Sequence, residues 1–256
     1  MRLRIFIIYG GVNILKDNER IDDLEFENLK IIQNKSWFCF GVDAVLLSDF
    51  AKDIKPNSNI IDLCSGSGII SILLSKKTKP KSITAIEIQK DVAEMSERSI
   101  KLNNLQDIIK VYNTDLNNLE NLLHNNSLDS IVTNPPYKEI NSGIQNESLN
   151  KLISRHEIKC NLDDILRVSS NLLKNNGSFY MVHRPNRLCD IICTMRKYNL
   201  EPKLIKFVQP NINKPPNLLL IKGVKNAKPF LKFENNLILY NLDGSYTNEV
   251  LKIYNK

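Results

Sequence analysis

Short apolar runs rich in β-branched residues alternate along the chain with longer stretches in which apolar positions recur every three to four residues. The first pattern is typical of buried strands and the second of helices. We expect strands at 59–63, 82–87, 108–112, 128–133, 178–183, 204–209 and 218–224, and helices at 68–77, 91–103, 162–173 and 188–198. Regular alternation of strand and helix predicts an α/β fold with a parallel, doubly wound sheet.

The length and the even spread of apolar residues indicate one domain. The chain has 256 residues, 42% of them hydrophobic, and no repeat, linker or long polar stretch interrupts the pattern. Residues 1–15 differ, because a basic start is followed by an apolar run that resembles a short signal peptide. This run lacks a small-residue cleavage site and is too short to cross a bilayer. We therefore expect an atypical extension over 1–15, a single domain over 16–256, and no membrane contact.

The cysteines indicate a reducing compartment. Their number is odd and their spacing forms no framework: Cys39, Cys64, Cys160, Cys189 and Cys193. The last two share a helical face, but no histidine or further cysteine nearby completes a tetrahedral site, so we expect packing residues and no metal. A cytoplasmic location follows as the expectation.

Ligands of doubly wound sheets bind at the carboxyl ends of the strands. In this chain those ends carry its polar, glycine-rich and proline-rich segments: 62–68, Glu87, Asp115, 134–137 and 183–185. Candidate chemistry is therefore expected at one edge of the sheet.

The segment Asp62-Leu-Cys64-Ser-Gly66-Ser-Gly68 joins a strand to a helix, and its glycines allow a sharp turn close to a ligand. A dinucleotide site would bring a pyrophosphate to this helix N-terminus, where the Asp62 carboxylate would repel it. An acid here suits a cationic ligand such as S-adenosyl-L-methionine. Glu87, at the next strand end, can accept the ribose hydroxyls, and Asp115 can meet the adenine amine. We expect Asp62, Cys64, Gly66, Gly68, Glu87 and Asp115 to bind this cofactor.

A second motif, Asn134-Pro135-Pro136-Tyr137, follows an apolar strand. The lone pair of an exocyclic base amine is delocalised into the ring, so the amine is a poor nucleophile. The Asn134 side-chain oxygen and the Pro135 carbonyl can accept its two hydrogens, and the prolines hold both acceptors in place beforehand. The Tyr137 ring, rather than its hydroxyl, is expected to stack on the base. These four residues are the candidate catalytic loop.

The total charge of +7 is concentrated in one C-terminal block. Between residues 196 and 232 the net charge is +8, so the rest of the chain carries −1. Such a block suits a polyanion such as RNA, with Lys203, Lys206 and Lys214 as candidate contacts. A solvated lysine-rich surface explains the same block equally well.

These motifs together resemble the bacterial tRNA adenine-37 N6-methyltransferase family, from about Leu15 to the C-terminus. The segments that carry the resemblance are 40–47, 62–70, 87–89, 134–137, 155–157, 181–185 and 243–247. The resemblance implies a Rossmann-like class I methyltransferase with a seven-stranded sheet whose final strand is antiparallel. It also implies methyl transfer from S-adenosyl-L-methionine to the exocyclic N6 of an adenine in tRNA. By resemblance, Phe40 and Asp43 flank the methionine end of the cofactor.

Two positions depart from the family pattern. Lys138 follows the catalytic loop where the family often has a bulky apolar or aromatic residue, and Ser67 replaces an asparagine of the glycine loop.

Further candidates lie near the predicted site. Arg155, which precedes a helix, can touch RNA phosphate or pair with Glu157. His183 and Arg184 end a strand beside the site; we expect RNA contact or, for His183, a structural hydrogen bond. Trp37 is expected in the core rather than on a base.

Other functions share part of this pattern. The asparagine–proline motif also occurs in protein-glutamine N5-methyltransferases and in N2-guanine methyltransferases of ribosomal RNA. The former carry a helical domain before the glycine loop, for which the residues before Asp62 leave little room. A non-catalytic RNA-binding protein on this fold is a third alternative, which the intact motifs disfavour.

Overall fold

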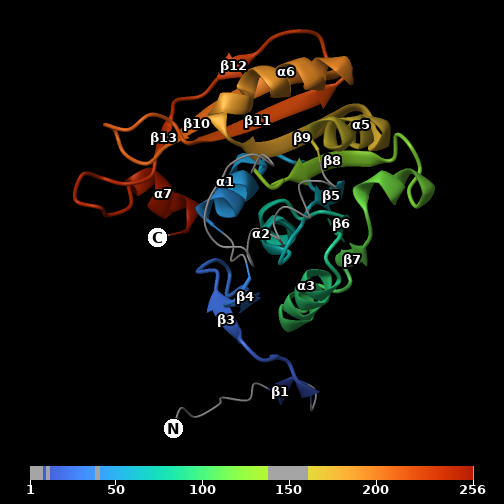
Figure 1. The fold of residues 1–256 in the computed structure, drawn as a ribbon, viewed down its shortest axis with the longest axis vertical. Helices are drawn as coiled ribbons and strands as arrows, with labels where there is room; N and C mark the ends of the chain where they lie inside the picture. The colour runs from blue at the N-terminus through green and yellow to red at the C-terminus, as the bar shows by residue number, and fades with distance from the viewer. Residues whose placement is uncertain (1–7, 10–11, 38–40, 138–160, 256) are drawn as a thin grey trace.

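The computed structural model describes residues 8–9, 12–37, 41–137 and 161–255, and the side chains of those from Ile14 onward (Figure 1). Its centre is a twisted sheet in the strand order β10-β11-β9-β8-β5-β6-β7. These strands are β5 (Asn59–Leu63), β6 (Ser82–Glu87), β7 (Ile109–Asn113), β8 (Leu128–Thr133), β9 (Leu173–His183), β10 (Leu200–Gln209) and β11 (Leu218–Lys225). Every expected strand is present, and β5, β6 and β8 have the expected bounds.

The direction of the strands agrees with the expected methyltransferase sheet. Strands β5 to β9 are parallel to one another, and β11 is antiparallel to both β9 and β10. Two further short strands, β12 (Lys232–Phe233) and β13 (Leu237–Ile238), pair with β10, so the sheet has nine strands rather than seven. The register aligns the strand ends, since Leu63 lies opposite both Ile86 and Thr133.

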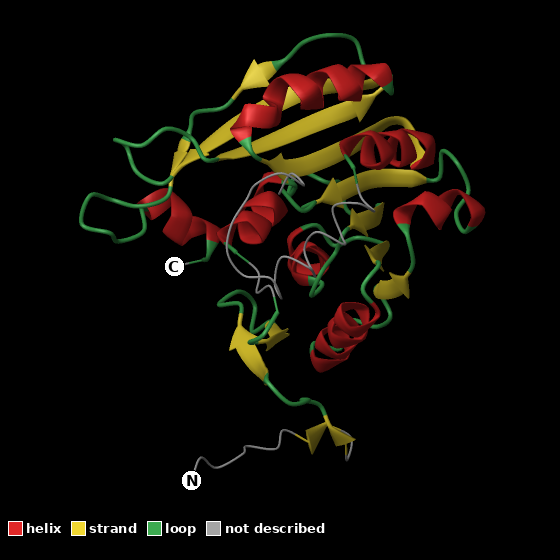
Figure 2. Cartoon of the chain, viewed as in Figure 1, coloured by secondary structure: helices red, strands yellow, loops and turns green. Residues whose placement is uncertain are grey.

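Helices cover both faces of the sheet (Figure 2). On one face α1 (Val42–Phe50), α2 (Ile69–Lys77), α3 (Lys90–Leu102) and α7 (Asn248–Ile253) share an apolar cluster with alternate strand residues such as Ile60. On the other face α5 (Leu162–Leu172), α6 (Leu188–Lys197) and the 3₁₀ turns η1 (Leu116–Asn121) and η2 (Pro185–Arg187) accompany a second cluster that includes Ile61. The successive residues Ile60 and Ile61 belong to opposite clusters, as the alternation of a strand buried on both faces requires.

A hairpin outside the main sheet was not expected from the sequence. Strands β3 (Glu19–Asp23) and β4 (Lys30–Asn34) pair antiparallel, and β4 packs on α3. Arg98 of α3 binds Glu19 through Nη1 (2.6 Å) and Nη2 (2.7 Å), and its Nη1 also donates to the carbonyl of Ile14 (2.6 Å). Ile14 is itself buried against Ile32, so the end of the expected extension 1–15 takes part in this packing. Before it, β1 (Ile8–Tyr9) pairs with β2 (Val12–Asn13).

No helix within the described ranges has both the length and the apolar character that a membrane span requires.

Candidate functional site

A cavity of about 470 Å³ opens at the carboxyl ends of β5, β6, β7 and β8. Its wall combines the glycine turn after β5, the ends of the next two strands, the catalytic loop after β8 and the first turn of α1. The segments that the sequence analysis singled out are therefore brought together at one edge of the sheet.

The glycine turn is built from three left-handed residues, Cys64 (φ +58°), Gly66 (φ +54°) and Gly68 (φ +83°). Cys64 and Gly66 line the cavity, and a Cβ on Gly66 would meet no atom within 4 Å. Gly68 does not line it. A Cβ there would lie 2.3 Å from the Ser96 hydroxyl, so Gly68 permits close packing of the turn against α3.

Asp62 lies beneath this turn rather than on the cavity wall. Its Oδ2 accepts hydrogen bonds from the backbone nitrogen (3.1 Å) and hydroxyl (2.7 Å) of Ser71, which fixes the first turn of α2. Its Oδ1 is buried and has no hydrogen-bond partner among the described residues. The pKa of Asp62 is raised to about 7, mainly by burial and to a lesser extent by the charge of Glu87. The Ser71 hydrogen bonds act in the opposite direction.

Glu87 and Asp115 both line the cavity. Glu87 is 5% exposed, and its two oxygens accept backbone hydrogen bonds from Gly66 (2.9 Å) and Gln89 (2.8 Å). Burial raises the pKa of Glu87, and these hydrogen bonds oppose the rise. Asp115 accepts from the backbone nitrogen of Asn117 (2.9 Å) and so caps η1. Each carboxylate is held in a fixed direction and retains lone pairs for a ligand.

All four residues of the candidate catalytic loop line the same cavity. The Tyr137 hydroxyl lies between two acceptors, Asp43 Oδ2 (3.1 Å) and the side-chain oxygen Oδ1 of Asn134. The Tyr137 ring meets the His183 ring edge to face, with centroids 5.3 Å apart, and the Arg184 guanidinium lies 5.0 Å from its centroid. The tyrosine is therefore fixed by contacts from three separate segments.

His183 and Arg184 belong to this cluster. His183 is 6% exposed, and its Nδ1 accepts the backbone N–H of Arg184 (2.8 Å). Burial, with the charge of Arg187, lowers the pKa of His183 to about 4, so the ring is neutral at pH 7. Of the two roles considered for His183, this burial favours the structural hydrogen bond. Arg184 lines the cavity and donates through Nη1 to the carbonyl of Asn217 (3.0 Å).

Much of the C-terminal basic block is neutralised within the molecule. Its internal partners are Arg196 with Glu201, Lys197 with Asp163, Lys206 with Glu234 and Glu249, and Lys222 with Asp53. Lys225 is 9% exposed and donates to the carbonyls of Ser170 and Leu173 at the end of α5. The block is therefore not one continuous free surface.

The three candidate RNA lysines lie in different settings. Lys206 is ion-paired, and Lys203 donates to the Lys228 carbonyl (3.0 Å) with its ammonium 5.9 Å from the Phe230 ring centroid. Lys214 forms no ion pair with the described residues. It lies between β10 and β11, on the segment whose Asn217 accepts from Arg184. Of the three, Lys214 is on the segment tied to the cavity wall.

Some expected site residues lie outside the described ranges, namely Phe40, Lys138 and Arg155. Conversely, Trp37, Ser65 and Thr114 line the cavity without having been expected there. Trp37 also packs in the cluster of Ile14, Ile32 and Met95, so its assignment to the core describes only part of its surroundings. Trp37 follows the β3–β4 hairpin, and no sequence motif predicts that it lies on the same cavity wall as the glycine turn.

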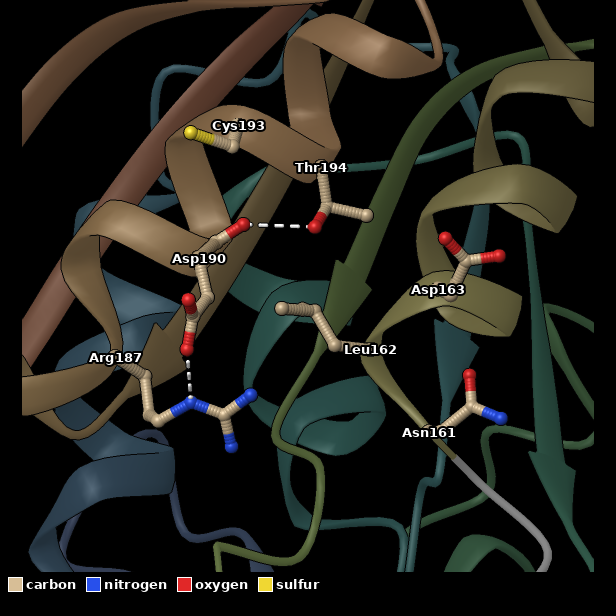
Figure 3. A pocket seen from close by; sticks show the side chains of 7 residues that line it. All are labelled: Asn161, Leu162, Asp163, Arg187, Asp190, Cys193 and Thr194. Atoms are coloured by element: carbon tan, nitrogen blue, oxygen red, sulfur yellow. Dashed lines mark hydrogen bonds and ion pairs between the residues drawn. The ribbon is translucent and has the colours of Figure 1, made fainter.

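A second, more open cavity lies between α5 and α6 (Figure 3). Its charged groups are mutually satisfied: Arg187 pairs with Asp190 (2.7 Å), and Asp163 pairs with Lys197. Neither the glycine turn nor the catalytic loop contributes to its wall, so we assign it no chemistry.

The chain is similar in sequence to tRNA methyltransferases and in fold to a solved methyltransferase structure. The chain is 25% identical to a tRNA1(Val) (adenine(37)-N6)-methyltransferase of Porphyromonas gingivalis, covering 91% of this chain and 93% of that protein. It is 28% identical to one of Parabacteroides distasonis, covering 80% and 85%. The crystal structure of a predicted O-methyltransferase, protein Atu636 from Agrobacterium tumefaciens, has the same fold, with a TM-score of 0.66 and 21% identity over 83% of this chain and 95% of that one.

The methyltransferase small domain family matches residues 40–197, a segment that contains the glycine turn, Glu87, Asp115 and the catalytic loop. The methyl donor that this membership implies is S-adenosyl-L-methionine. The match covers more than half of the chain, and the chain therefore belongs to the methyltransferase small domain family.

Proposed function

We propose that this protein transfers a methyl group from S-adenosyl-L-methionine to the exocyclic N6 of an adenine in tRNA, at position 37. The observation that carries the proposal is the catalytic loop, whose Asn134 lies on the wall of the cavity that also contains Glu87 and the glycine turn. The names of the relatives, matched over most of this chain, support the same substrate. A tRNA substrate would locate the enzyme in the cytoplasm.

The residues of the cavity fit the cofactor. In this proposal the Glu87 carboxylate accepts the two ribose hydroxyls and Asp115 the adenine amine, and backbone hydrogen bonds hold both carboxylates in place. Ser65 Oγ on the wall is a buried polar atom without a hydrogen-bond partner among the described residues, which is the condition expected of a group that a polar ligand satisfies. Bound there, the sulfonium would supply an activated methyl group.

The catalytic loop would then prepare the amine. The Asn134 side-chain oxygen and the Pro135 carbonyl accept its two N–H hydrogens, which draws the nitrogen toward tetrahedral geometry and frees its lone pair. The prolines fix the backbone, so no reorganisation is needed during the reaction. The remaining work of the site is to hold the amine in line with the methyl group.

Contacts with RNA are proposed at the mouth of this cavity. Arg184 lines the cavity, Lys214 belongs to the segment whose Asn217 binds Arg184, and Arg155 is a further candidate. Lys203 and Lys206 are weaker candidates, because Lys206 is ion-paired and Lys203 binds a backbone carbonyl.

The test is nucleoside mass spectrometry on tRNA from cells that lack this enzyme, incubated with the protein and the cofactor. We expect N6-methyladenosine to accumulate. A transcript in which guanine replaces adenine 37 is the matched control and should stay unmethylated. N2-methylguanosine as the only product, or methylation of a protein glutamine without any tRNA product, would contradict the proposal.

A further inference from the structure

The catalytic asparagine is linked to α1 through the Tyr137 hydroxyl. This hydroxyl contacts Asn134 Oδ1 on one side and Asp43 Oδ2 (3.1 Å) on the other. Asp43 is itself held in place, since its Oδ1 accepts the backbone N–H of Ala44 (3.0 Å) in the first turn of α1. The three side chains therefore form a continuous chain of polar contacts along the cavity wall.

The hydroxyl has a single proton and cannot donate to both neighbours. A carboxylate is the stronger acceptor, because a hydrogen bond to a charged oxygen is stronger than one to a neutral amide. The proton is therefore directed to Asp43, and the Tyr137 oxygen is left as an acceptor. In the structure Asn134 Oδ1 faces this hydroxyl, so two acceptors, Oδ1 and Asp43 Oδ2, share one proton. Turning the carboxamide over brings its NH₂ to the hydroxyl and gives every donor an acceptor, because the orientation of a carboxamide follows from the hydrogen bonds around it.

We propose that Asp43 and the Tyr137 hydroxyl are positioning groups that fix the orientation of the Asn134 carboxamide. Asn134 Nδ2 donates to the Tyr137 hydroxyl, which donates to Asp43 Oδ2, and the Asn134 oxygen is turned toward the substrate amine. The inference rests on the proposed function, in which that oxygen is the acceptor. In the opposite orientation the NH₂ of Asn134 would face the N–H groups of the substrate, and donor would oppose donor.

The surroundings of Tyr137 support a fixed role for the hydroxyl. His183 and Arg184 hold the ring from β9, so the hydroxyl cannot leave Asp43 and Asn134 without disturbing both contacts. Burial, followed by the charge of Asp43, raises the pKa of Tyr137 above its ordinary value, so the hydroxyl keeps its proton at every physiological pH. The tyrosine hydroxyl, which the sequence alone leaves without a role, thus acquires one.

The test measures single-turnover methyl transfer to unmodified tRNA by the full chain at saturating cofactor. Tyr137→Phe keeps the ring and removes only the hydroxyl, so we expect the rate to fall about 5- to 20-fold, the worth of one hydrogen bond. The KM for tRNA and the affinity for S-adenosylhomocysteine should stay within about twofold, because neither depends on the orientation of Asn134.

Tyr180→Phe is the matched control. The Tyr180 hydroxyl also donates to an aspartate, Asp53 (2.7 Å), but outside the cavity wall. This variant should lose a comparable amount of stability while its transfer rate is unchanged.

A double-mutant cycle isolates the chain of contacts. Asp43→Ala should slow transfer in the natural background and have little further effect in Tyr137→Phe, and Asp43→Asn, which retains an acceptor oxygen, should keep a higher rate than Asp43→Ala. Full activity of Tyr137→Phe, or additive effects of the two substitutions, would overturn the inference while leaving the proposed function intact. Full activity of Asn134→Ala would overturn both.

Discussion

Asp62 combines burial with an unsatisfied oxygen, and this combination has a consequence for stability. Its Oδ2 accepts from Ser71, and its Oδ1 meets no donor in the part of the chain that the structure describes. A carboxylate in this position is costly when ionised, which is why burial raises its pKa to about 7. The protonation state of this carboxyl, directly under the glycine turn, therefore affects the stability of the fold.

The first prediction concerns Asp62→Asn. The folded pKa of Asp62 (about 7) exceeds the ordinary value of 3.8 that applies to the unfolded chain. Between these two pH values the folded state therefore binds more protons than the unfolded state. The stability that this protonation contributes is fully present at low pH and is lost as pH rises. The substitution removes this titration. The unfolding free energy of Asp62→Asn relative to the natural protein should therefore increase from about pH 4 to pH 7, by at most about 4 kcal/mol, and then level off.

Urea unfolding at several pH values measures this difference. His183, whose pKa is lowered to about 4, contributes a slope of the opposite sign, but it does so in both proteins and cancels in the comparison. Parallel stability curves would show that Asp62 is ionised throughout the range.

Among the elements, the β3–β4 hairpin is attached to α3 by a buried ion pair of Arg98 with Glu19. The Arg98 side chain is 14% exposed and that of its partner Glu19 is 1% exposed, so removal of the arginine would leave a buried charge unpaired. The hairpin leads directly into Trp37 on the cavity wall. Its attachment to α3 therefore supports the cofactor site.

The second prediction follows from this attachment. Arg98→Met preserves the length of the side chain but should lower the unfolding free energy by about 2–4 kcal/mol. Arg167→Met is the control, because Arg167 pairs with Glu120 and Asp164 while 34% exposed, and its loss should be below about 1 kcal/mol. Equal losses in denaturant titrations would mean that the hairpin is held by apolar contacts alone.

The elements that the sequence predicts are those with a clear hydrophobic pattern. Strands β5, β6 and β8 are apolar runs that end at motifs, and their bounds and the edge they share were correctly predicted. Helix α1 was missed because the five consecutive residues from Ala44 to Ser48 are all buried, which leaves no polar face and no helical period. The polar strand β3 was missed because its place depends on Arg98, which lies far away in sequence.

At the site, the sequence correctly predicted which edge of the sheet carries Glu87 and Asn134, because a motif marks each strand end, and both line the cavity. It could not place Asp62 beneath the turn instead of in the cavity, because burial depends on the packing of α2. Nor could it show that the Tyr137 hydroxyl contacts Asp43, which comes from a separate helix.

On the scale of the whole molecule, net charge is a poor guide to where RNA would bind. Lysines and arginines that are adjacent in sequence face different neighbours, and Arg196, Lys197, Lys206 and Lys222 pair with acids of the same chain. The electrostatic contribution to tRNA affinity should therefore come from fewer residues than the total of +7 suggests.

The third prediction compares two lysines of the block. Lys214→Gln should weaken tRNA binding and reduce the slope of log affinity against log salt by about 0.7–0.9, the value for one phosphate contact. Lys206→Gln should leave the slope unchanged, because Glu234 and Glu249 already balance that charge. Binding titrations over a range of salt concentrations measure both slopes. Equal effects of the two substitutions would mean that the whole basic block contacts RNA as one surface, which would contradict this prediction.

The most direct test of the central claim is single-turnover methyl transfer by Asn134→Ala. The substitution removes one of two acceptors for the target amine, and the interaction strengthens in the transition state, so we predict a rate about 10²–10³-fold lower. The affinities for S-adenosylhomocysteine and tRNA should change little, because neither the cofactor carboxylates nor the basic residues are altered. A variant that melts at lower temperature but transfers the methyl group at the natural rate would contradict the account, since the loop would then only close the strand.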